Sequence, residues 1–216
     1  KNEMQTAVLQ LRVLCWVILT GGLLLQTSAP AAAPSRDLPH YPGCCDASAA
    51  APVNDTLFAV ASDDDNILRL YRHGPPGPAV RTVDLSRHAG VGRREELDLE
   101  GGARLGDLLF WIGSHARNED GARRPARRIV LATAITGDGE AAQLVPFGQP
   151  CWSLLEALAS TPELNGIAWL AAAEKPGEAE GALNIEGLAA GPGDSLWIGF
   201  RSPLQAGDAL VVPLLN

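Results

Sequence analysis

Short apolar runs separated by turn residues make up the chain from about residue 53 onward. The runs 57–62 and 67–71 flank the polar segment Asp63-Asp64-Asp65-Asn66, which predicts a β-hairpin. Only 152–160 and 168–174 have a helical pattern, so the sequence predicts an all-β fold with a short helical insertion near 152–174. The further predicted strands are 79–85, 96–100, 108–113, 128–135, 143–147, 183–189, 195–200 and 209–214.

An internal repeat links two of these predicted strand pairs. Residues 98–113 recur as residues 184–199 at a constant offset of 86, and six of the 16 aligned residues are identical. A fainter copy of the second half matches 55–62 to 107–114 at an offset of 52. Because Trp111 and Trp197 occupy matching positions of the repeat, we predict that both pack in the core. The identical pairs are Glu100/Glu186, Gly101/Gly187, Ala103/Ala189, Trp111/Trp197, Ile112/Ile198 and Gly113/Gly199.

Repeats built from several short strands are typical of β-propeller blades. One blade cannot bury both faces of its sheet, so blades must pack on one another around an axis. An offset of 86 then spans two blades. We predict a β-propeller domain of four-stranded blades over residues 54–216, with room for about four blades and incomplete at its C-terminus. The rival fold is a β-sandwich with decorating helices.

The N-terminal residues differ from the rest of the chain. Arg12 precedes an apolar run over 13–25, and small residues around 29–33 supply a cleavage site, which predicts a signal peptide over 1–33. The alternative of a membrane anchor needs roughly 20 apolar residues, more than this run offers. We therefore expect a secreted or periplasmic protein without a stable membrane anchor after cleavage, and a flexible lead-in over 34–53.

Charge and cysteine content narrow the range of partners. Without residues 1–33 the chain has 15 Lys and Arg against 24 Asp and Glu, a net charge of −9, which argues against a nucleic-acid partner. Cys44, Cys45 and Cys151 leave three alternatives open in an oxidising compartment. Cys151 is bonded to one of the adjacent pair, all three are free, or the partner lies elsewhere.

Acidic residues alternate with leucines near the first copy of the repeat. Glu96, Asp98 and Glu100 take every second position, with Leu97 and Leu99 between them. Successive side chains of a strand point to opposite faces, so a strand here places the three carboxylates on one face.

The second copy repeats this arrangement with Asn184 and Glu186. Inner strands of a propeller line its central channel, so we expect Glu100 and Glu186 to converge there. With Asp98 and Asn184 they form a set of oxygen ligands that suits Ca²⁺ or Mg²⁺. The alternative is that these carboxylates cap turns or solvate the channel mouth. Each glutamate precedes a glycine, which permits a tight bend or a close backbone approach.

Polar loops follow the repeated Trp-Ile-Gly. His115, Arg117 and Asn118 lie in one loop and Arg201 in the other. Arg117 and Arg201, with Asn118, are candidates to bind an anionic small molecule, and His115 is a candidate to transfer a proton. A salt bridge to a neighbouring blade is the alternative for Arg201. The basic run 123–128 is predicted to be a solvated loop, and the absence of a Gly-x-Ser-x-Gly elbow excludes a serine hydrolase of that type.

Several of these segments resemble a known family. The segments Asp98-Leu99-Glu100-Gly101, 111–118, Asn184-Ile185-Glu186-Gly187-Leu188 and 198–204 are similar to the bacterial domain-of-unknown-function family 3616, with Gly102 in place of the more usual aliphatic residue. The Glu-Gly-Leu repeat of that family is similar to that of phytase-like propeller proteins. The resemblance implies a propeller fold in a chain longer than this one, and leaves the activity open.

Two functions fit these features. One is a Ca²⁺-dependent hydrolase of phosphoester or lactone bonds, in which the metal polarises the scissile group and activates water. The other is a non-catalytic propeller whose loops bind a ligand or a protein. Turnover that EDTA removes would distinguish the first from the second.

Overall fold

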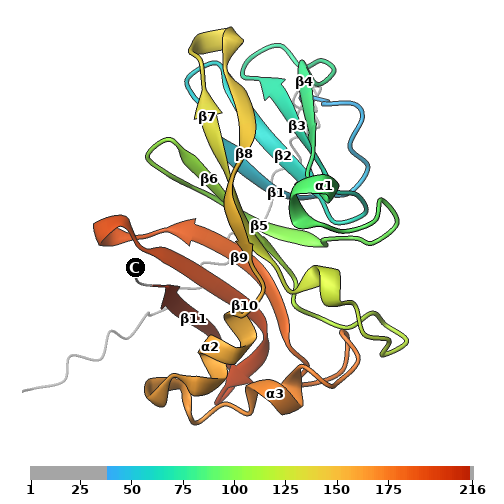
Figure 1. The fold of residues 1–216 in the computed structure, drawn as a ribbon, viewed down its shortest axis with the longest axis vertical. Coiled ribbons are helices and arrows are strands. Elements are labelled where there is room, and N and C mark those ends of the chain that lie inside the picture. Colours follow the sequence, from blue (N-terminus) through green and yellow to red (C-terminus); the bar gives the residue numbers. More distant parts are fainter. Residues whose placement is uncertain (1–37, 215–216) are drawn as a thin grey trace, which may run out of the picture. The chain divides into compact units, whose positions relative to one another are not determined.

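The computed structural model describes residues 38–214, in which the chain forms three consecutive antiparallel sheets (Figure 1). The first sheet has the order β1-β2-β3-β4, the second β5-β6-β7-β8 and the third β11-β10-β9, so every sheet is a meander. The strands are β1 (Ala47–Pro52), β2 (Leu57–Ser62), β3 (Ile67–Arg72), β4 (Arg81–Asp84), β5 (Leu99–Leu105), β6 (Leu108–Gly113), β7 (Val130–Thr136), β8 (Gln143–Cys151), β9 (Asn184–Ala190), β10 (Leu196–Gln205) and β11 (Asp208–Leu214).

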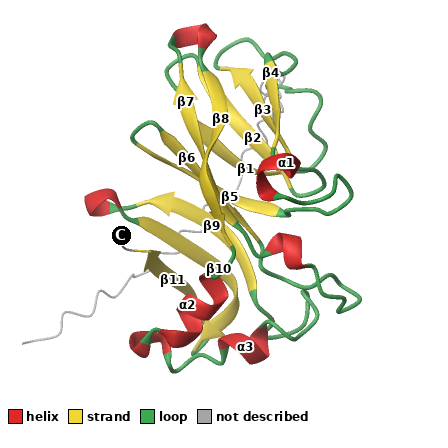
Figure 2. Ribbon diagram, in the orientation of Figure 1, coloured by secondary structure: helices red, strands yellow, loops and turns green. Residues whose placement is uncertain are grey.

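Helices are short and lie in the connections (Figure 2). Two of them, α2 and α3, fall within the predicted insertion between the second and third sheets. None of the described helices has the length and apolar character needed to cross a membrane. The helices are α1 (Ser86–Ala89), α2 (Leu154–Ser160) and α3 (Trp169–Ala172), and the 3-10 turns are η1 (Pro125–Arg127), η2 (Gly139–Ala141), η3 (Pro162–Leu164) and η4 (Pro192–Asp194).

The chain is mostly β, as the sequence predicts, and the three sheets do not close into a ring within residues 38–214. β2 and β6 have the predicted bounds. Two of the differences from the predicted strand bounds bear on the site. β1 lies inside the predicted lead-in, because its alanine-rich sequence has no polar alternation. The strand predicted over 96–100 begins only at Leu99 and runs on to Leu105, since Asp98 has a left-handed backbone (φ 53°) that ends the extended conformation.

Two further sequence predictions concern the ends and the thiols of the chain. The predicted signal peptide and its cleavage site lie outside the described residues. A bond between Cys151 and either member of the adjacent pair is absent from residues 38–214, in which Cys44, Cys45 and Cys151 are all free.

A β-bulge recurs at the same place in all three sheets. The pairing register shifts between Ala47 and Ala49 in β1, between Leu99 and Gly101 in β5, and around Glu186 in β9. The extra residues are thus Ser48, Glu100 and Glu186. A bulge bends its strand and re-aims the side chain it carries. Both repeated glutamates therefore owe their direction to a bulge and not to simple strand alternation.

The second strand of the repeat is shifted by one residue relative to the sequence alignment. Ala103 pairs with Phe110 in the second sheet, whereas the aligned Ala189 pairs with Trp197 in the third. Trp197 therefore corresponds to Phe110 in the fold and lies on the opposite face from Trp111. A one-residue register change reverses every side chain of a strand. Trp111 is fully buried but Trp197 is 38% exposed, so the prediction that both pack in the core is wrong for Trp197.

Neighbouring sheets pack against each other through opposite faces. We call the face that carries Ala59, Phe110 or Trp197 the front of its sheet, and the other face its back. Leu57 and Ala59 on the front of the first sheet share a core cluster with Trp111 and Leu131 on the back of the second.

The second and third sheets meet in the same sense. Phe110 and Ala132 on the front of the second sheet line a cavity of about 200 Å³ together with Leu196 and Leu214 on the back of the third. Apolar residues of α2 and α3 belong to the same cluster as Ile198, and so complete this core.

The first strands of the sheets, β1, β5 and β9, lie side by side, with β5 in contact with both of the others. At Gly101 the contact leaves no room for a side chain, because a Cβ there would lie 2.7 Å from the Cβ of Leu188. Gly101→Ala should therefore destabilise the protein by roughly 1–3 kcal/mol in urea unfolding. Gly187→Ala is the matched control, since its Cβ would meet nothing closer than 3.4 Å. Equal effects of the two substitutions would contradict the close approach.

Candidate functional site

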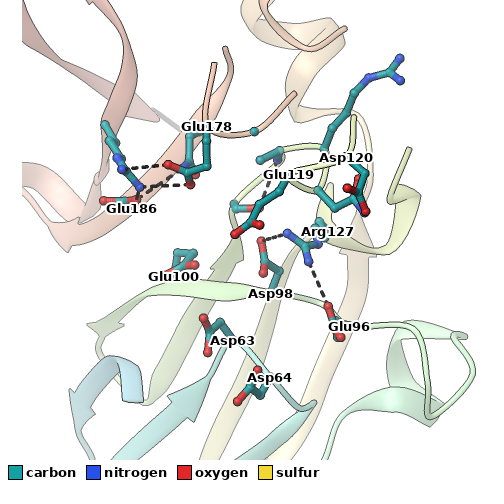
Figure 3. Close-up of a pocket in the computed structure, with 17 residues that line it drawn as sticks. Asp63, Asp64, Glu96, Asp98, Glu100, Glu119, Asp120, Arg127, Glu178 and Glu186 are labelled. Atoms are coloured by element: carbon teal, nitrogen blue, oxygen red, sulfur yellow. Dashed lines mark hydrogen bonds and ion pairs between the residues drawn. The ribbon is translucent and has the colours of Figure 1, made fainter. Parts of the chain in front are cut away.

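A cavity of about 500 Å³ lies where the three sheets present their acidic residues (Figure 3). Nine carboxylate side chains line it against three guanidinium groups. This excess of negative charge in a concave site attracts cations and repels free anions. The charged lining residues are Asp63, Asp64, Glu96, Asp98, Glu100, Glu119, Asp120, Glu178, Glu186, Arg117, Arg127 and Arg201.

The topology brings this set together from distant parts of the sequence. Asp98 and Glu100 stand at the start of β5, and Asn184 and Glu186 at the start of β9, directly beside it. The β2–β3 turn adds Asp63 and Asp64, and the loop after β6 adds Glu119 and Asp120. The four residues predicted as metal ligands therefore line one cavity. So do Arg117, Asn118 and Arg201, the predicted anion-binding residues.

Glu100 is the carboxylate with the most perturbed proton affinity. Partial burial, followed by the negative charges of Asp98, Asp63 and Glu186, raises the pKa of Glu100 to about 7. Among the described residues Glu100 has no salt-bridge partner, although Arg127 lowers its pKa slightly at longer range. Glu100 is thus an under-compensated carboxylate close to a second one, the condition that a bound cation relieves.

Asp98 is held in the wall of the cavity by Arg127. The Arg127 guanidinium donates from Nη1 to Asp98 Oδ2 at 3.0 Å and from Nη2 to Glu96 Oε2 at 2.9 Å. Asp98 is 7% exposed, and burial raises the pKa of its carboxyl, against the opposing effects of Ser114 and Arg127.

Arg127 is a site residue that sequence reasoning missed. The basic run 123–128 was predicted to be solvated, but the Arg127 side chain is only 16% exposed. The reason is tertiary. The 3-10 turn Pro125–Arg127 buries Ala126 and places Arg127 against the start of β5. The local sequence does not distinguish it from Arg124, which is exposed.

Asn184 contributes an oxygen that has no donor. Its side chain is 7% exposed, and its Nδ2 donates to Glu186 Oε1 at 3.3 Å. Its Oδ1 is buried and accepts no hydrogen bond from the described residues. An unsatisfied buried carbonyl oxygen costs about 1–3 kcal/mol. Amide oxygens are common Ca²⁺ ligands, so a cation in the cavity would satisfy this atom.

The two predicted anion-binding arginines are both engaged by carboxylates. Arg201 donates from Nη1 to Glu186 Oε1 at 2.9 Å and from Nη2 to Glu178 Oε2 at 3.1 Å, which is the salt-bridge alternative for this residue. Its side chain is still 53% exposed at the rim. Arg117 is 14% exposed and binds Glu174, Ala173 O and Gly121 O. Arg117 therefore fixes loops, and Arg201 keeps access to solvent.

His115 is not part of the cavity wall. It is 1% exposed, its Nδ1 is 2.9 Å from Gly113 O, and burial lowers its pKa to about 4. It is therefore a neutral side chain in the core at neutral pH. Asn118 does line the cavity, and its Oδ1 accepts from Ala122 N at 2.6 Å, which shapes the loop.

A close acidic group shares two of its three residues with the cavity wall. Ligand atoms of Asp46, Asp63 and Asp64 lie within 4.8 Å of one another. Burial and the charge of Asp46 raise the pKa of Asp63. Asp63 and Asp64 stand in the β2–β3 turn, as the hairpin prediction required.

Compared with models of known protein families and with curated protein sequences, the chain has no significant match. The resemblance to family 3616 and to phytase-like propellers therefore stays a prediction.

Proposed function

We propose that this chain is an exported β-propeller-type protein whose acidic cavity binds a divalent cation, Ca²⁺ in the first place. The observation that carries the proposal is that one cavity is lined both by Glu100, which has no salt bridge among residues 38–214, and by Asn184, whose buried Oδ1 accepts no hydrogen bond there. Asp98 and Glu186 complete a ligand set of hard oxygen atoms.

Four features support the propeller arrangement. The sheets are consecutive meanders, their first strands lie side by side, and each sheet packs with its front against the back of the next. In a β-sandwich the two sheets would instead face each other with the same side, front to front or back to back. The repeated bulge at Ser48, Glu100 and Glu186 marks the same place in each unit.

Within this proposal the residues have separate roles. Asp98, Glu100, Asn184 and Glu186 would hold the cation, and Arg127 fixes the direction of Asp98. When bound, Ca²⁺ would supply the positive charge that polarises a phosphoester or lactone group. Arg201, half-exposed at the rim, is the side chain able to exchange a carboxylate for an anionic ligand. The non-catalytic alternative uses the same cation and the same arginine to bind a ligand without turnover.

A calcium titration tests the cation site. Ca²⁺ should raise the Tm of the wild-type protein by mass action, by roughly 5–10 °C at a hundredfold excess over Kd. Glu186→Gln should remove most of this rise, because it deletes a ligand charge. Asp120→Asn, at the exposed rim of the same cavity, is the matched control and should respond like the wild type. An unchanged response of Glu186→Gln would refute the assignment.

A substrate panel separates the two versions of the function. Phosphate monoesters and lactones are incubated with the protein with and without EDTA. Turnover that EDTA abolishes and Ca²⁺ restores is the expected result for a hydrolase. Calcium binding without turnover of any substrate favours the binding protein.

A further inference from the structure

Arg201 joins two carboxylates that belong to different parts of the site (Figure 3). Its Nη1 donates to Glu186 Oε1 at 2.9 Å and its Nη2 donates to Glu178 Oε2 at 3.1 Å. Glu186 is one of the proposed cation ligands, whereas Glu178 lies in the connection between α3 and β9 and outside that ligand set. Arg201 therefore keeps one carboxylate partner when a cation takes the other.

Two adjacent β-bulges build the contact between Arg201 and Glu186. The pairing of β9 with β10 shifts on both sides of Phe200, which makes Glu186 the extra residue of β9 and Arg201 the extra residue of β10. Because a bulge re-aims the side chain it carries, the two side chains can meet although their strands are neighbours in one sheet. The ion pair is thus a local product of the β9–β10 pair.

Glu186 Oε1 is the atom for which a cation and Arg201 compete. It accepts from Arg201 Nη1 and, at 3.3 Å, from Asn184 Nδ2. Carboxylates bind Ca²⁺ through one or both oxygens, so a cation on Glu186 places two positive charges beside the guanidinium. Like charges at this range repel. Each of the two positive groups therefore weakens the binding of the other to Glu186.

Arg201 also lines a second hollow, of about 430 Å³, next to the acidic cavity. The two share Glu178, Asn184 and Arg201 in their walls, and Pro203 and Leu204 belong to the second hollow alone. The Arg201 side chain is 53% exposed, and within residues 38–214 its Nε donates to no acceptor. There is room beside the guanidinium for a small ligand.

We propose that Arg201 forms a binding site for a phosphate-type oxyanion that becomes available when the cation binds. The inference rests on the cation site of the proposed function. Without a cation, Arg201 is held between two carboxylates and the acidic cavity repels anions. A cation on Glu186 leaves Arg201 to Glu178 alone, and the oxyanion of a small ligand replaces Glu178 on the guanidinium fork. Cation and anion then raise each other's affinity by the same factor.

Calorimetric titrations with Ca²⁺ and with methylphosphonate test this coupling. Methylphosphonate carries the oxyanion of a phosphate monoester and has no ester bond to hydrolyse. It should bind the wild type at least about fivefold more tightly in saturating Ca²⁺ than in EDTA, the lower end of the usual range for coupled sites.

Arg201→Met should bind Ca²⁺ more tightly than the wild type, by roughly two- to fivefold, because the competitor for Glu186 is gone. Its affinity for methylphosphonate should be low and independent of Ca²⁺. Arg72→Met is the matched control. Arg72 forms an ion pair of similar exposure with Glu140, lines neither cavity, and should leave both affinities as in the wild type.

Glu178→Gln should strengthen methylphosphonate binding to the Ca²⁺-loaded protein by roughly two- to fivefold, because the carboxylate that competes for Arg201 is removed. Glu180→Gln removes the same charge from the wall of the second hollow, where the Glu180 carboxylate has no ion pair with Arg201. Its effect should be smaller than about twofold, since exposed charges without contact are screened.

Three results would overturn the inference. Methylphosphonate binding that stays Ca²⁺-dependent in Arg201→Met would show that the metal alone holds the anion. Weaker Ca²⁺ binding by Arg201→Met would show that Arg201 supports the cation site instead of competing with it. A wild type whose Tm rises with Ca²⁺, but whose methylphosphonate affinity is the same in Ca²⁺ and in EDTA, would remove the coupling and leave the cation site intact.

Discussion

Glu100→Gln is expected to make the cation-free protein more stable and at the same time to abolish its stabilisation by Ca²⁺. The pKa of Glu100 rises from its usual 4.5 to about 7 in the folded protein. The folded state therefore binds more protons than the unfolded state between these two values, and the stability of the wild type falls as pH rises from about 4.5 to 7. Because Glu100 is partly solvated, we expect a total loss of roughly 1–2 kcal/mol.

Glutamine cannot ionise, so Glu100→Gln should not show this loss. At pH 8 without added metal, the variant should exceed the wild type by roughly 1–2 kcal/mol in urea unfolding, and at pH 4 the two should be similar. With saturating Ca²⁺ the wild type should be more stable than the variant, because only the wild type retains the charge of this ligand. Glu119→Gln, an exposed carboxylate of the same cavity, is the control and should match the wild type throughout. A variant less stable than the wild type at pH 8 without metal would contradict this reading of Glu100.

Arg127→Met should be strongly destabilising at neutral pH. It removes the donor to Asp98, whose carboxylate is 7% exposed, and a buried charge left without its partner costs about 3–5 kcal/mol. We expect about 3 kcal/mol in urea unfolding, because Ser114 still contributes to Asp98. The loss should shrink at acidic pH, where Asp98 becomes protonated in both states.

Two comparisons isolate the ion pair from lost packing. Adding Asp98→Asn to Arg127→Met should recover most of the stability, since the double variant contains no unpaired buried charge. Arg124→Met, in the same basic run but exposed, should change stability by no more than about 0.5 kcal/mol. A double variant as unstable as Arg127→Met alone would assign the effect to packing and not to charge.

A strand can be located from the sequence only where turn residues or polar alternation mark its ends. The runs that became β2 and β6 are bounded on both sides by turn residues and were located to the residue. β1 was missed because Ala47–Pro52 has no polar alternation, so its strand state comes from pairing with β2. The shift that exposes Trp197 was also hidden, because the sequences align without a gap. The turn Gly106-Asp107 and the longer connection 191–195 differ in length and set different registers.

For the site, the repeat in the amino-acid sequence is enough to show which residue types recur at equivalent places. Glu100, Glu186, Asp98 and Asn184 were recognised because repetition marks positions with equivalent surroundings, and all four line the cavity. Which arginines neutralise the charges of these carboxylates depends on the tertiary structure. Arg127 binds Asp98 and Arg201 binds Glu186, whereas Glu100 has no salt bridge within the described part of the chain, and His115 is buried away from the cavity. Burial and partner choice depend on segments far apart along the chain, and local patterns carry no information about those distances.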